Sequence, residues 1–507
     1  MGELVLNISK FIIILVTFFI SLSAVAVING GGRAFTNSDY NVQCGQQRKG
    51  IDVCPDGYEA NQGFPAFPGA EGFGADSVGG RGGTVIKVTN LNDSGVGSFR
   101  AAVTAIGPRI VVFETSGIIN LASQIFVTDP FITIAGETSP GGVLVTGYSF
   151  YLNTHDVIVR HMRFRVGSHR VTDGSNADPE SLDSFGIWGD TVPGGANDAY
   201  NIILDHVSIG WGVDENMGIS YRAHDISIQW SIIANALENA GHPKGEHSKG
   251  LLISQKFGGA ANVSVSHTLF AHNRDRNPLI SGDANNYADI RNNVIYNGYH
   301  GLSGVLVGVN AGANIIHNYI KAGPDTTAGA WEAGYFDGPP AFNNSVYTFG
   351  NIGPHRTDQG QEQWVLADDF RQQAASVNYQ RATPWAEPNI TTFISSESMG
   401  DCIASAAGAT APFLDSVDQA TVTSYLTGTG TYTPNVSYPA DFPVFTTPAV
   451  PADSDNDGIA DSFETTVGFN VGVNDSAEDL DGDGYTNIEE YLHFLSASSY
   501  TRSAACQ

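Results

Sequence analysis

Apolar and polar residues alternate along many short segments between about residues 110 and 320, where no amphipathic helical pattern of any length occurs. Six of these segments, including NIILDHVSI and NVSVSHTLF, can be superimposed residue by residue. A period of two places every second side chain on one face of a strand. We therefore predict β-strands that bury one face in a common core. The segments begin at Asp156, Asn201, Asp225, Asn262, Ala288 and Ala313.

The segments recur at a spacing typical of a solenoid. Their successive starts lie 45, 24, 37, 26 and 25 residues apart, as expected for coils that stack strand on strand with occasional insertions. Helical crossovers would need about a dozen residues with helical character, and the connections are instead rich in Gly, Asn, Asp and Ser. We predict an all-β fold, a right-handed parallel β-helix; a β-propeller or a jelly roll is the alternative.

The sixth position of the superimposed segments carries polar or aromatic residues, among them His161, His206 and His267. Equivalent polar residues on successive coils commonly stack and hydrogen-bond with each other. These histidines also lack the short ligand spacing of a zinc site. We predict a structural role for them.

Two acidic segments near the C-terminus, DSDNDGIADSFE and DLDGDGYTNIEE, each match a twelve-residue calcium loop. In such a loop, oxygen-bearing side chains and one backbone carbonyl surround the ion, and a central glycine permits the sharp turn. The flanking helices are short and carry no Met-rich groove, so we predict two structural calcium sites in a small EF-hand-like module. The predicted ligands are Asp453, Asp455, Asp457, Ile459, Asp461 and Glu464 in the first loop, and Asp479, Asp481, Asp483, Tyr485, Asn487 and Glu490 in the second.

The N-terminus matches a secretory signal peptide, with Lys10, an apolar run over residues 11–20 and Ala24-Val25-Ala26 as the cleavage site. An uncleaved anchor is the alternative. We expect a secreted protein, not bound to membrane after cleavage. The predicted organisation is a signal peptide (1–26), an N-terminal segment (27–63), the β-helix (64–420), a linker (421–452) and the calcium module (453–507).

The four cysteines, Cys44, Cys54, Cys402 and Cys506, are consistent with an oxidising compartment. Cys44 and Cys54 enclose a short polar segment and could be bridged, whereas a bridge between Cys402 and Cys506 is possible but is supported by no sequence pattern. Four cysteines allow three connectivities, and the sequence does not choose among them.

Charge narrows the possible partners. The 507-residue protein has 24 Lys and Arg against 52 Asp and Glu, a formal net charge of −28. Nucleic-acid binding needs a basic surface, so no nucleic-acid partner is expected. An anionic ligand would need local cations or bound metal.

Candidate functional residues lie between the predicted strands. Residues one coil apart become neighbours about 4.8 Å apart, which would bring Asp183, Asp214 and Glu215 into an acidic patch beside Lys249 and Arg276. An acidic patch next to a basic one suits an anionic sugar substrate held partly through calcium.

Three stretches together resemble the pectate lyases, the secreted parallel β-helix enzymes of polysaccharide lyase family 1. They are AFPGAEGFGADSVGGRGGTVIKVTNLNDSGVGSFRAAV from Ala66, VSIGWGVDEN and FAHNRDRNP. More closely, the protein is similar to the branch that ends in a calcium-loop module of EF-hand-like, dockerin-like or thrombospondin-type-3-like kind. The resemblance covers residues 66–298 and the C-terminus, and residues 320–450 are not matched.

The resemblance implies calcium-dependent β-elimination of polygalacturonate, with calcium as cofactor. The arginine of the family's R-x-P element falls on Arg276 as the base. The calcium carboxylates fall on Asp183, Asp214 and Glu215. Lys249 would bind the substrate carboxylate, helped by Arg274. Because guanidinium has a pKa above about 12, an arginine base implies an alkaline optimum.

Two departures from the family pattern concern subsites and calcium affinity. No basic residue follows in 279–282, and Ser181 stands where some relatives have a second aspartate, for which Glu180 or Asp178 could substitute. The GGRGG stretch around Arg81 lacks the Lys-Ser/Thr of a phosphate-binding loop, so a structural turn is expected there.

Alternatives to a monomeric pectate lyase are a lyase for alginate or rhamnogalacturonan, and a non-catalytic β-helical carbohydrate-binding protein.

Overall fold

The computed structural model describes most residues after position 63. All described residues lie within the unit Tyr40–Gln507. The predicted signal peptide, the segment 27–63 and the cysteines Cys44 and Cys54 lie outside them. The described residues are 64–192, 195, 198–255, 262–282, 286–298, 306–307, 311–326, 346–354, 356–361, 381–504 and 506.

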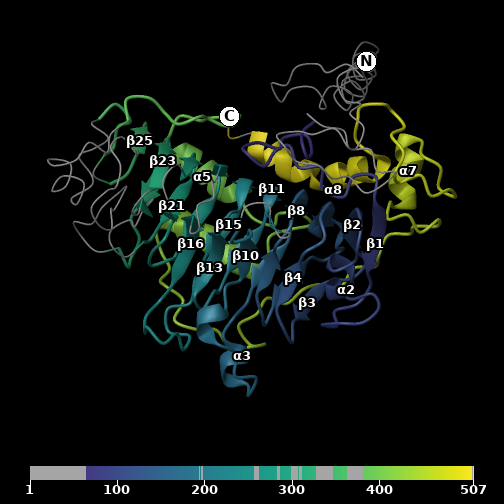
Figure 1. Ribbon diagram of the computed structural model, residues 1–507, viewed down its shortest axis with the longest axis horizontal. Helices are drawn as coiled ribbons and strands as arrows, with labels where there is room; N and C mark the ends of the chain where they lie inside the picture. The colour runs from purple at the N-terminus through teal and green to yellow at the C-terminus, as the bar shows by residue number, and fades with distance from the viewer. Residues whose placement is uncertain are drawn as a thin grey trace, which may run out of the picture. The chain divides into compact units, whose positions relative to one another are not determined.

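The strands stack into three parallel sheets (Figure 1). The first sheet contains β1 (Thr84–Val88), β2 (Arg109–Phe113), β5 (Ile132–Ala135), β8 (Val157–Arg160), β11 (Tyr200–Asp205), β14 (His224–Gln229), β17 (Asn262–Ser266), β20 (Asn286–Arg291), β23 (Ala311–Ile316) and β25 (Val346–Phe349). The second contains β4 (Ile125–Val127), β7 (Phe150–Leu152), β10 (Phe185–Trp188), β13 (Glu215–Ser220), β16 (Lys249–Gln255), β19 (Leu279–Gly282) and β22 (Leu306–Val307). The third contains β3 (Gly117–Asn120), β6 (Val143–Thr146), β9 (Arg163–Arg165), β12 (Ser208–Gly210), β15 (Ile232–Ala234), β18 (Leu269–Ala271), β21 (Val294–Tyr296) and β24 (Tyr319–Lys321).

A central coil contributes one strand to each sheet, so that β11, β12 and β13 belong to the first, third and second sheets in turn. Neighbouring strands pair in parallel throughout the three sheets. This confirms the predicted parallel β-helix and excludes a propeller or jelly roll, which are built from antiparallel strands. Helices are few among the described residues: α2 (Phe99–Val103), α3 (His169–Thr172), α5 (Glu397–Ala406), α6 (Ser416–Thr427), α7 (Asp461–Val467) and α8 (Asn487–Ala504), with 3-10 turns η2 (Gly136–Thr138) and η3 (Pro179–Ser181).

The six superimposed segments become β8, β11, β14, β17, β20 and β23 of the first sheet. In the first four, the predicted alignment matches the observed register, which pairs Val157, Ile202, Ile226 and Val263. In the last two, the alignment is wrong by one residue, because Ala288 and Ala313 occupy this register. The observed register places Ala288 and Ile290 in the core. The predicted one would turn Asp289 toward it, because a slip of one residue exchanges the two faces of a strand.

A ladder of rings lines the corner at which the first sheet ends. Its residues adopt left-handed backbone conformations with φ between 48° and 52°. Their ring centroids lie 5.0, 6.3 and 4.5 Å apart along the stack, which agrees with the structural role predicted for the histidines. The ladder consists of His161, His206, Trp230 and His267.

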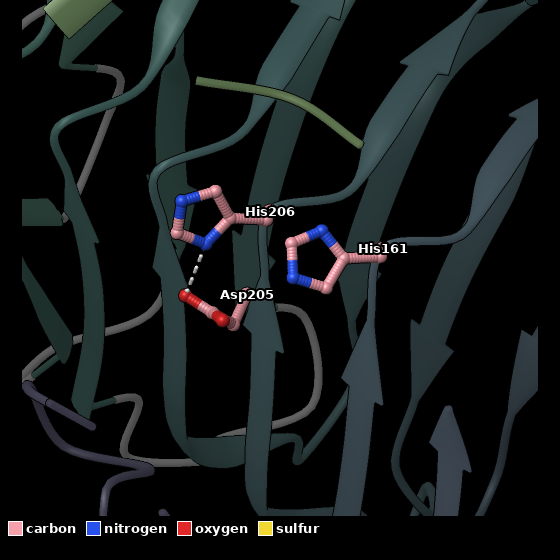
Figure 2. A group of neighbouring side chains, drawn as sticks. All are labelled: His161, Asp205 and His206. Atoms are coloured by element: carbon pink, nitrogen blue, oxygen red, sulfur yellow. Dashed lines mark hydrogen bonds and ion pairs between the residues drawn. The ribbon is translucent and has the colours of Figure 1, made fainter. Parts of the chain in front are cut away.

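A buried carboxylate, Asp205, lies beside the first two rings of this ladder (Figure 2). Asp205 accepts hydrogen bonds from His206 Nδ1 at 2.9 Å and from Gln229 Nε2 at 2.8 Å. Arg160 Nε lies 3.7 Å from the same carboxylate. The adjacent His161 accepts a backbone N–H from Ala411 through Nδ1. A metal cation here would meet the positive charge of Arg160, which favours packing over metal binding.

Three asparagines on successive coils form a second ladder inside the helix. Asn318 Oδ1 accepts hydrogen bonds from the backbone N–H of Asn293 at 2.9 Å and from its Nδ2 at 3.1 Å. Asn318 Nδ2 donates in turn to Ile290 O and to Asn351 Oδ1, both at 2.9 Å. All three asparagines are fully buried, so each satisfies backbone groups at the turn that no strand can pair.

The segment after the last strand packs back on the β-helix. Helix α6 begins after Asp415, whose carboxylate accepts a hydrogen bond from Arg165 at 2.5 Å, and Asp418 in its first turn does the same. All three side chains are buried. A disulfide joins Cys402 in α5 to Cys506. Helix α8, yellow in Figure 1, packs its apolar residues Ile488 and Leu492 on the first sheet.

The structure differs from the expected linker at 421–452. The second half of α6 lies in this range, and Tyr432, Val436 and Phe442 within it are buried. Val436 and Phe442 share an apolar cluster with Trp211 of the β-helix. The Pro and Thr content that suggested a linker reflects an extended conformation, whose apolar residues still bury on the body. None of the described helices has the length and apolar character of a membrane span.

We expect Asn318→Ala to lower the free energy of unfolding by about 3 kcal/mol, because it leaves buried partners of the asparagine ladder unpaired. Urea unfolding followed by circular dichroism measures the change. The exposed Asn239→Ala serves as the matched control and should change stability by less than about 0.5 kcal/mol. A loss for Asn318→Ala no larger than the control's would contradict the role of the ladder.

Candidate active site

The second sheet lines up charged residues from successive coils at one edge. Glu215 opens β13 and lies opposite Lys249, the first residue of β16. The backbone of Lys249 in turn forms a parallel β-bridge with Asp275 on the next coil. On the other side, the backbone N–H of Glu215 donates to Asp183 Oδ1 at 3.0 Å. The stacking of coils therefore brings together residues that are far apart in the sequence.

Three carboxylates form the acidic patch predicted from the sequence. Oxygens of Asp183, Asp214 and Glu215 all lie within 4.8 Å of one another. Asp183 and Glu215 are only 8% and 6% exposed. Burial, together with the charge of Asp214, raises the pKa of Asp183 well above its usual range. Ionised carboxylates packed this closely need a cation, and an all-oxygen set is the kind that calcium prefers.

Arg276 extends into this patch. Its guanidinium forms an ion pair with Glu215, and its backbone N–H donates to Asp275 Oδ1 at 2.8 Å. Burial lowers the pKa of Arg276, although the charges of Asp214 and Asp183 act in the opposite direction. The structure thus places the predicted base beside the predicted calcium ligands.

The other two predicted cations differ in position. Lys249 Nζ lies 2.7 Å from Asp275 Oδ2, within the same row of residues. Arg274 Nη1 instead contacts Glu238 Oε1 at 2.8 Å and Glu246 Oε2 at 2.5 Å. Lys249 therefore belongs to the charged row, whereas Arg274 is engaged with carboxylates of the preceding loop.

Two histidines contact the acidic patch and were not predicted from the sequence. Their Nε2 atoms lie 2.7 Å (His247) and 3.3 Å (His242) from the same oxygen, Asp214 Oδ1. The two rings stack at 3.7 Å, and both residues are 5% exposed. Burial opposes ionisation of Asp214, but the hydrogen bond and charge of His247 hold its pKa below the usual range. The available signal was the pair of histidines in GHPKGEH, five residues apart between two strands.

The loop that carries these histidines rests on the C-terminal extended segment. Glu238 N–H donates to Thr433 O at 2.9 Å, and Asn239 N–H donates to Pro434 O at 2.7 Å. His247 N–H donates to Glu238 O at 2.9 Å. The orientation of Asp214 thus depends on residues about two hundred positions later in the sequence.

The first C-terminal loop folds around its carboxylates. The carboxylate of Asp453 accepts hydrogen bonds from the backbone N–H groups of Asp457 and Gly458. It also forms an ion pair with Lys87, whose Nζ lies 2.6 Å from Asp453 Oδ2. Oxygens of Asp453, Asp455 and Asp457 lie within 4.8 Å of one another. Ile459, whose carbonyl is a predicted ligand, is buried beside them.

The second loop has the same kind of turn. Asp479 accepts the N–H groups of Gly482 and Gly484. The carboxylates of Asp481 and Asp483 accept the N–H groups two residues on, from Asp483 and Tyr485. Burial and the nearby Asp483 raise the pKa of Glu490 to about 7.

Arg81 joins this module to the start of the β-helix. Its guanidinium pairs with Glu489 at 3.0 Å and lies over the rings of Phe64 and Tyr485. A Cβ at the neighbouring Gly80 would lie 1.9 Å from Arg109 O, so the glycine is required by close approach of the backbone. Arg81 is structural, as its sequence context predicts.

Comparisons with known proteins place this protein in a family. No family model matches it. The probable pectate lyase C of Aspergillus terreus is 36% identical over 450 residues, covering 86% of this chain and 95% of that protein. The probable pectate lyase C of Aspergillus fumigatus is 36% identical over 448 residues, covering 86% and 94%. That of Emericella nidulans is 34% identical over 449 residues, covering 87% and 95%.

Solved structures with a similar fold include the major allergen from cedar pollen, with 15% identity and a TM-score of 0.48 over 67% of this chain and 92% of that one. Another is the thermostable pectate lyase PL 47, with 14% identity and a TM-score of 0.46 over 68% and 97%. The sequence identity to the Aspergillus proteins, which extends over most of both sequences, shows that this chain belongs to the pectate lyase family and is a polysaccharide lyase.

Proposed function

We propose that this protein is a secreted, calcium-dependent pectate lyase that cleaves polygalacturonate by β-elimination. The observation that carries the proposal is the position of Arg276, a partly buried cation, against the carboxylates of Asp183, Asp214 and Glu215. The predicted signal peptide and the disulfide between Cys402 and Cys506 support action outside the cell.

Asp183, Asp214 and Glu215 would hold the calcium ion. When bound, calcium would supply Lewis-acid chemistry that makes the proton on carbon 5 of the substrate more acidic. Asp214 is prepared for this role because both histidines contact its Oδ1, which leaves Oδ2 to face a ligand.

Arg276 removes the proton from carbon 5 as a general base. The electron pair of the broken C–H bond forms the double bond between carbons 4 and 5, and the bond from carbon 4 to the glycosidic oxygen breaks. Burial lowers the pKa of Arg276, which increases the fraction of neutral guanidine at a given alkaline pH. The departing oxygen takes a proton from solvent.

The neighbouring cations have separate roles. Lys249, in the charged row with Glu215, would bind a substrate carboxylate. Arg274 is already paired with Glu238 and Glu246, which favours a role in fixing their loop over direct contact with the polymer. The two C-terminal loops would bind calcium for stability, since Asp453 and Glu489 tie them to the first coils.

Arg276→Ala should lower the rate of polygalacturonate cleavage by at least about a hundredfold, the typical contribution of a positioned base. The rise in ultraviolet absorbance from unsaturated products measures the rate, with calcium and with a chelator. Lys244→Ala removes a nearby exposed cation and is the matched control. Full activity in Arg276→Ala would remove Arg276 as the base. A flat trace from the wild-type protein, repeated on alginate and rhamnogalacturonan, would favour a carbohydrate-binding role.

The pH profile should rise through the alkaline range. A base acts only when deprotonated, so below the pKa of Arg276 the neutral fraction and the rate should increase about tenfold per pH unit at saturating calcium. In Arg276→Lys the rise should move to lower pH, because lysine has a reference pKa of about 10.4. An alkaline limb that stays at the same pH in this variant argues against the assignment.

His247→Ala should raise the calcium concentration for half-maximal activity about tenfold, as is typical for loss of a hydrogen bond that orients a metal ligand. The maximal rate at saturating calcium should change little. His247→Gln, which keeps an N–H donor, should restore much of the affinity. A loss of maximal rate without a change in calcium requirement would show that His247 does not act through Asp214.

A further inference from the structure

A group of carboxylates in the C-terminal module extends beyond the twelve-residue loop that the sequence predicts. Oxygens of Asp457, Glu464 and Asp475 lie within 4.8 Å of one another. Asp457 and Glu464 are fully buried, and Asp475 is 9% exposed. Asp475 lies eleven residues after the last loop position, between α7 and α8.

Several oxygens in this group have no protein partner among the described residues. They are both carboxylate oxygens of Glu464, Oδ2 of Asp457 and both oxygens of the neighbouring Asp455. Burial and the surrounding carboxylates raise the pKa of Glu464 to about 7 and that of Asp457 to about 6. Lys87, the cation at this loop, pairs with Asp453 and Glu114. Buried carboxylates in such a group are stabilised by a bound cation.

Asp461, the predicted ligand at position 9, is used differently. Its Oδ1 accepts the backbone N–H of Ser454 at 2.7 Å, and its Oδ2 accepts the Ser454 hydroxyl at 2.8 Å. Both oxygens of Asp461 therefore lie against Ser454 at the start of the loop. Asp475 also accepts hydrogen bonds, from Asn487 Nδ2 at 3.1 Å and from the Asn470 N–H at 3.4 Å, but its carboxylate lies within the group. The carboxylate that faces Asp457 and Glu464 comes from Asp475.

We propose that Asp475, in place of Asp461, supplies the remaining carboxylate of the first calcium site, together with Asp455, Asp457 and Glu464. This inference rests on the structural calcium role proposed above and names its ligand. An all-oxygen donor set with several carboxylates suits a hard cation such as calcium.

Asp475 also connects this site to α8. Asn487, the first residue of α8, donates from Nδ2 to Asp475 O at 2.9 Å and to Asp475 Oδ1 at 3.1 Å. The next residue, Ile488, donates its N–H to Ser476 O and packs on the first sheet. A calcium ion bound through Asp475 would therefore fix the start of the helix that covers the first coils.

The test compares Asp475→Asn with Asp461→Asn in the full-length protein. Both changes keep the size of the side chain and replace one acceptor oxygen by an NH2 group. In Asp461→Asn the remaining oxygen can accept the Ser454 N–H, and the new NH2 group can donate to the Ser454 hydroxyl. In Asp475→Asn the remaining oxygen can accept from Asn487 Nδ2, so the two variants differ mainly in whether the lost charge belongs to the site. Calcium binding is measured by titration calorimetry, and the melting temperature is measured with calcium and with a chelator. We expect Asp475→Asn to weaken one calcium site at least about tenfold and to reduce the calcium-dependent rise in melting temperature. Asp461→Asn should bind within about twofold of wild type.

The melting temperature in chelator shows whether Asp475→Asn folds, since without calcium it should melt close to the wild-type value. A calcium loss confined to Asp461→Asn, or an equal loss in both variants, overturns the proposal. Polygalacturonate cleavage is measured in parallel. Calcium binding that depends on Asp475 in a protein without lyase activity would retain this site and reject the proposed function. Full lyase activity with unchanged calcium binding in Asp475→Asn would reject this site alone.

Discussion

The structure depends on parallel, in-register stacking of its coils. Each strand of the first sheet places the same positions over those of the strand before it, as Val157, Ile202 and Ile226 do. Because hydrogen bonds and buried side chains repeat at the same positions, an error of one residue would turn polar side chains toward the core. The same stacking carries the corner ring ladder and the asparagine ladder. It also aligns Glu215 with Lys249 at the edge of the second sheet.

Buried arginines and buried carboxylates are stabilised in different ways in this protein. Several arginines that are buried away from the acidic patch are paired with carboxylates, as Arg165 is with Asp415 and Asp418. In two groups of carboxylates, burial instead raises the pKa of a member, Asp183 in one and Glu464 in the other. In a protein with a net charge of −28, these are the places where a bound cation contributes most. The candidate active site and the C-terminal module thus share one feature, a group of closely spaced carboxylates that are partly or fully buried.

The C-terminal third of the sequence supports the functional residues. The extended segment at Thr433 and Pro434 pairs with the loop that carries both histidines, and that loop contacts Asp214. Helix α8 covers the first coils, where Ile488 and Leu492 pack. Residues that a sequence pattern assigns to a linker therefore help to position a carboxylate on the central coils.

Local patterns in the sequence determined much of this protein. The period of two predicted the strands, and the spacing near 25 residues predicted the solenoid. The motif residues around Asp214 and Arg276 predicted which side chains would meet, because stacked coils bring equivalent positions together. The register failed at Ala288, where small and polar residues weaken the alternation. Only the tertiary structure brought His242 and His247 to Asp214, engaged Arg274 with Glu238, and placed Asp475 beside Asp457 and Glu464. These contacts join loops whose separation in the sequence follows no period, so their geometry depends on how the loops pack against the finished coils.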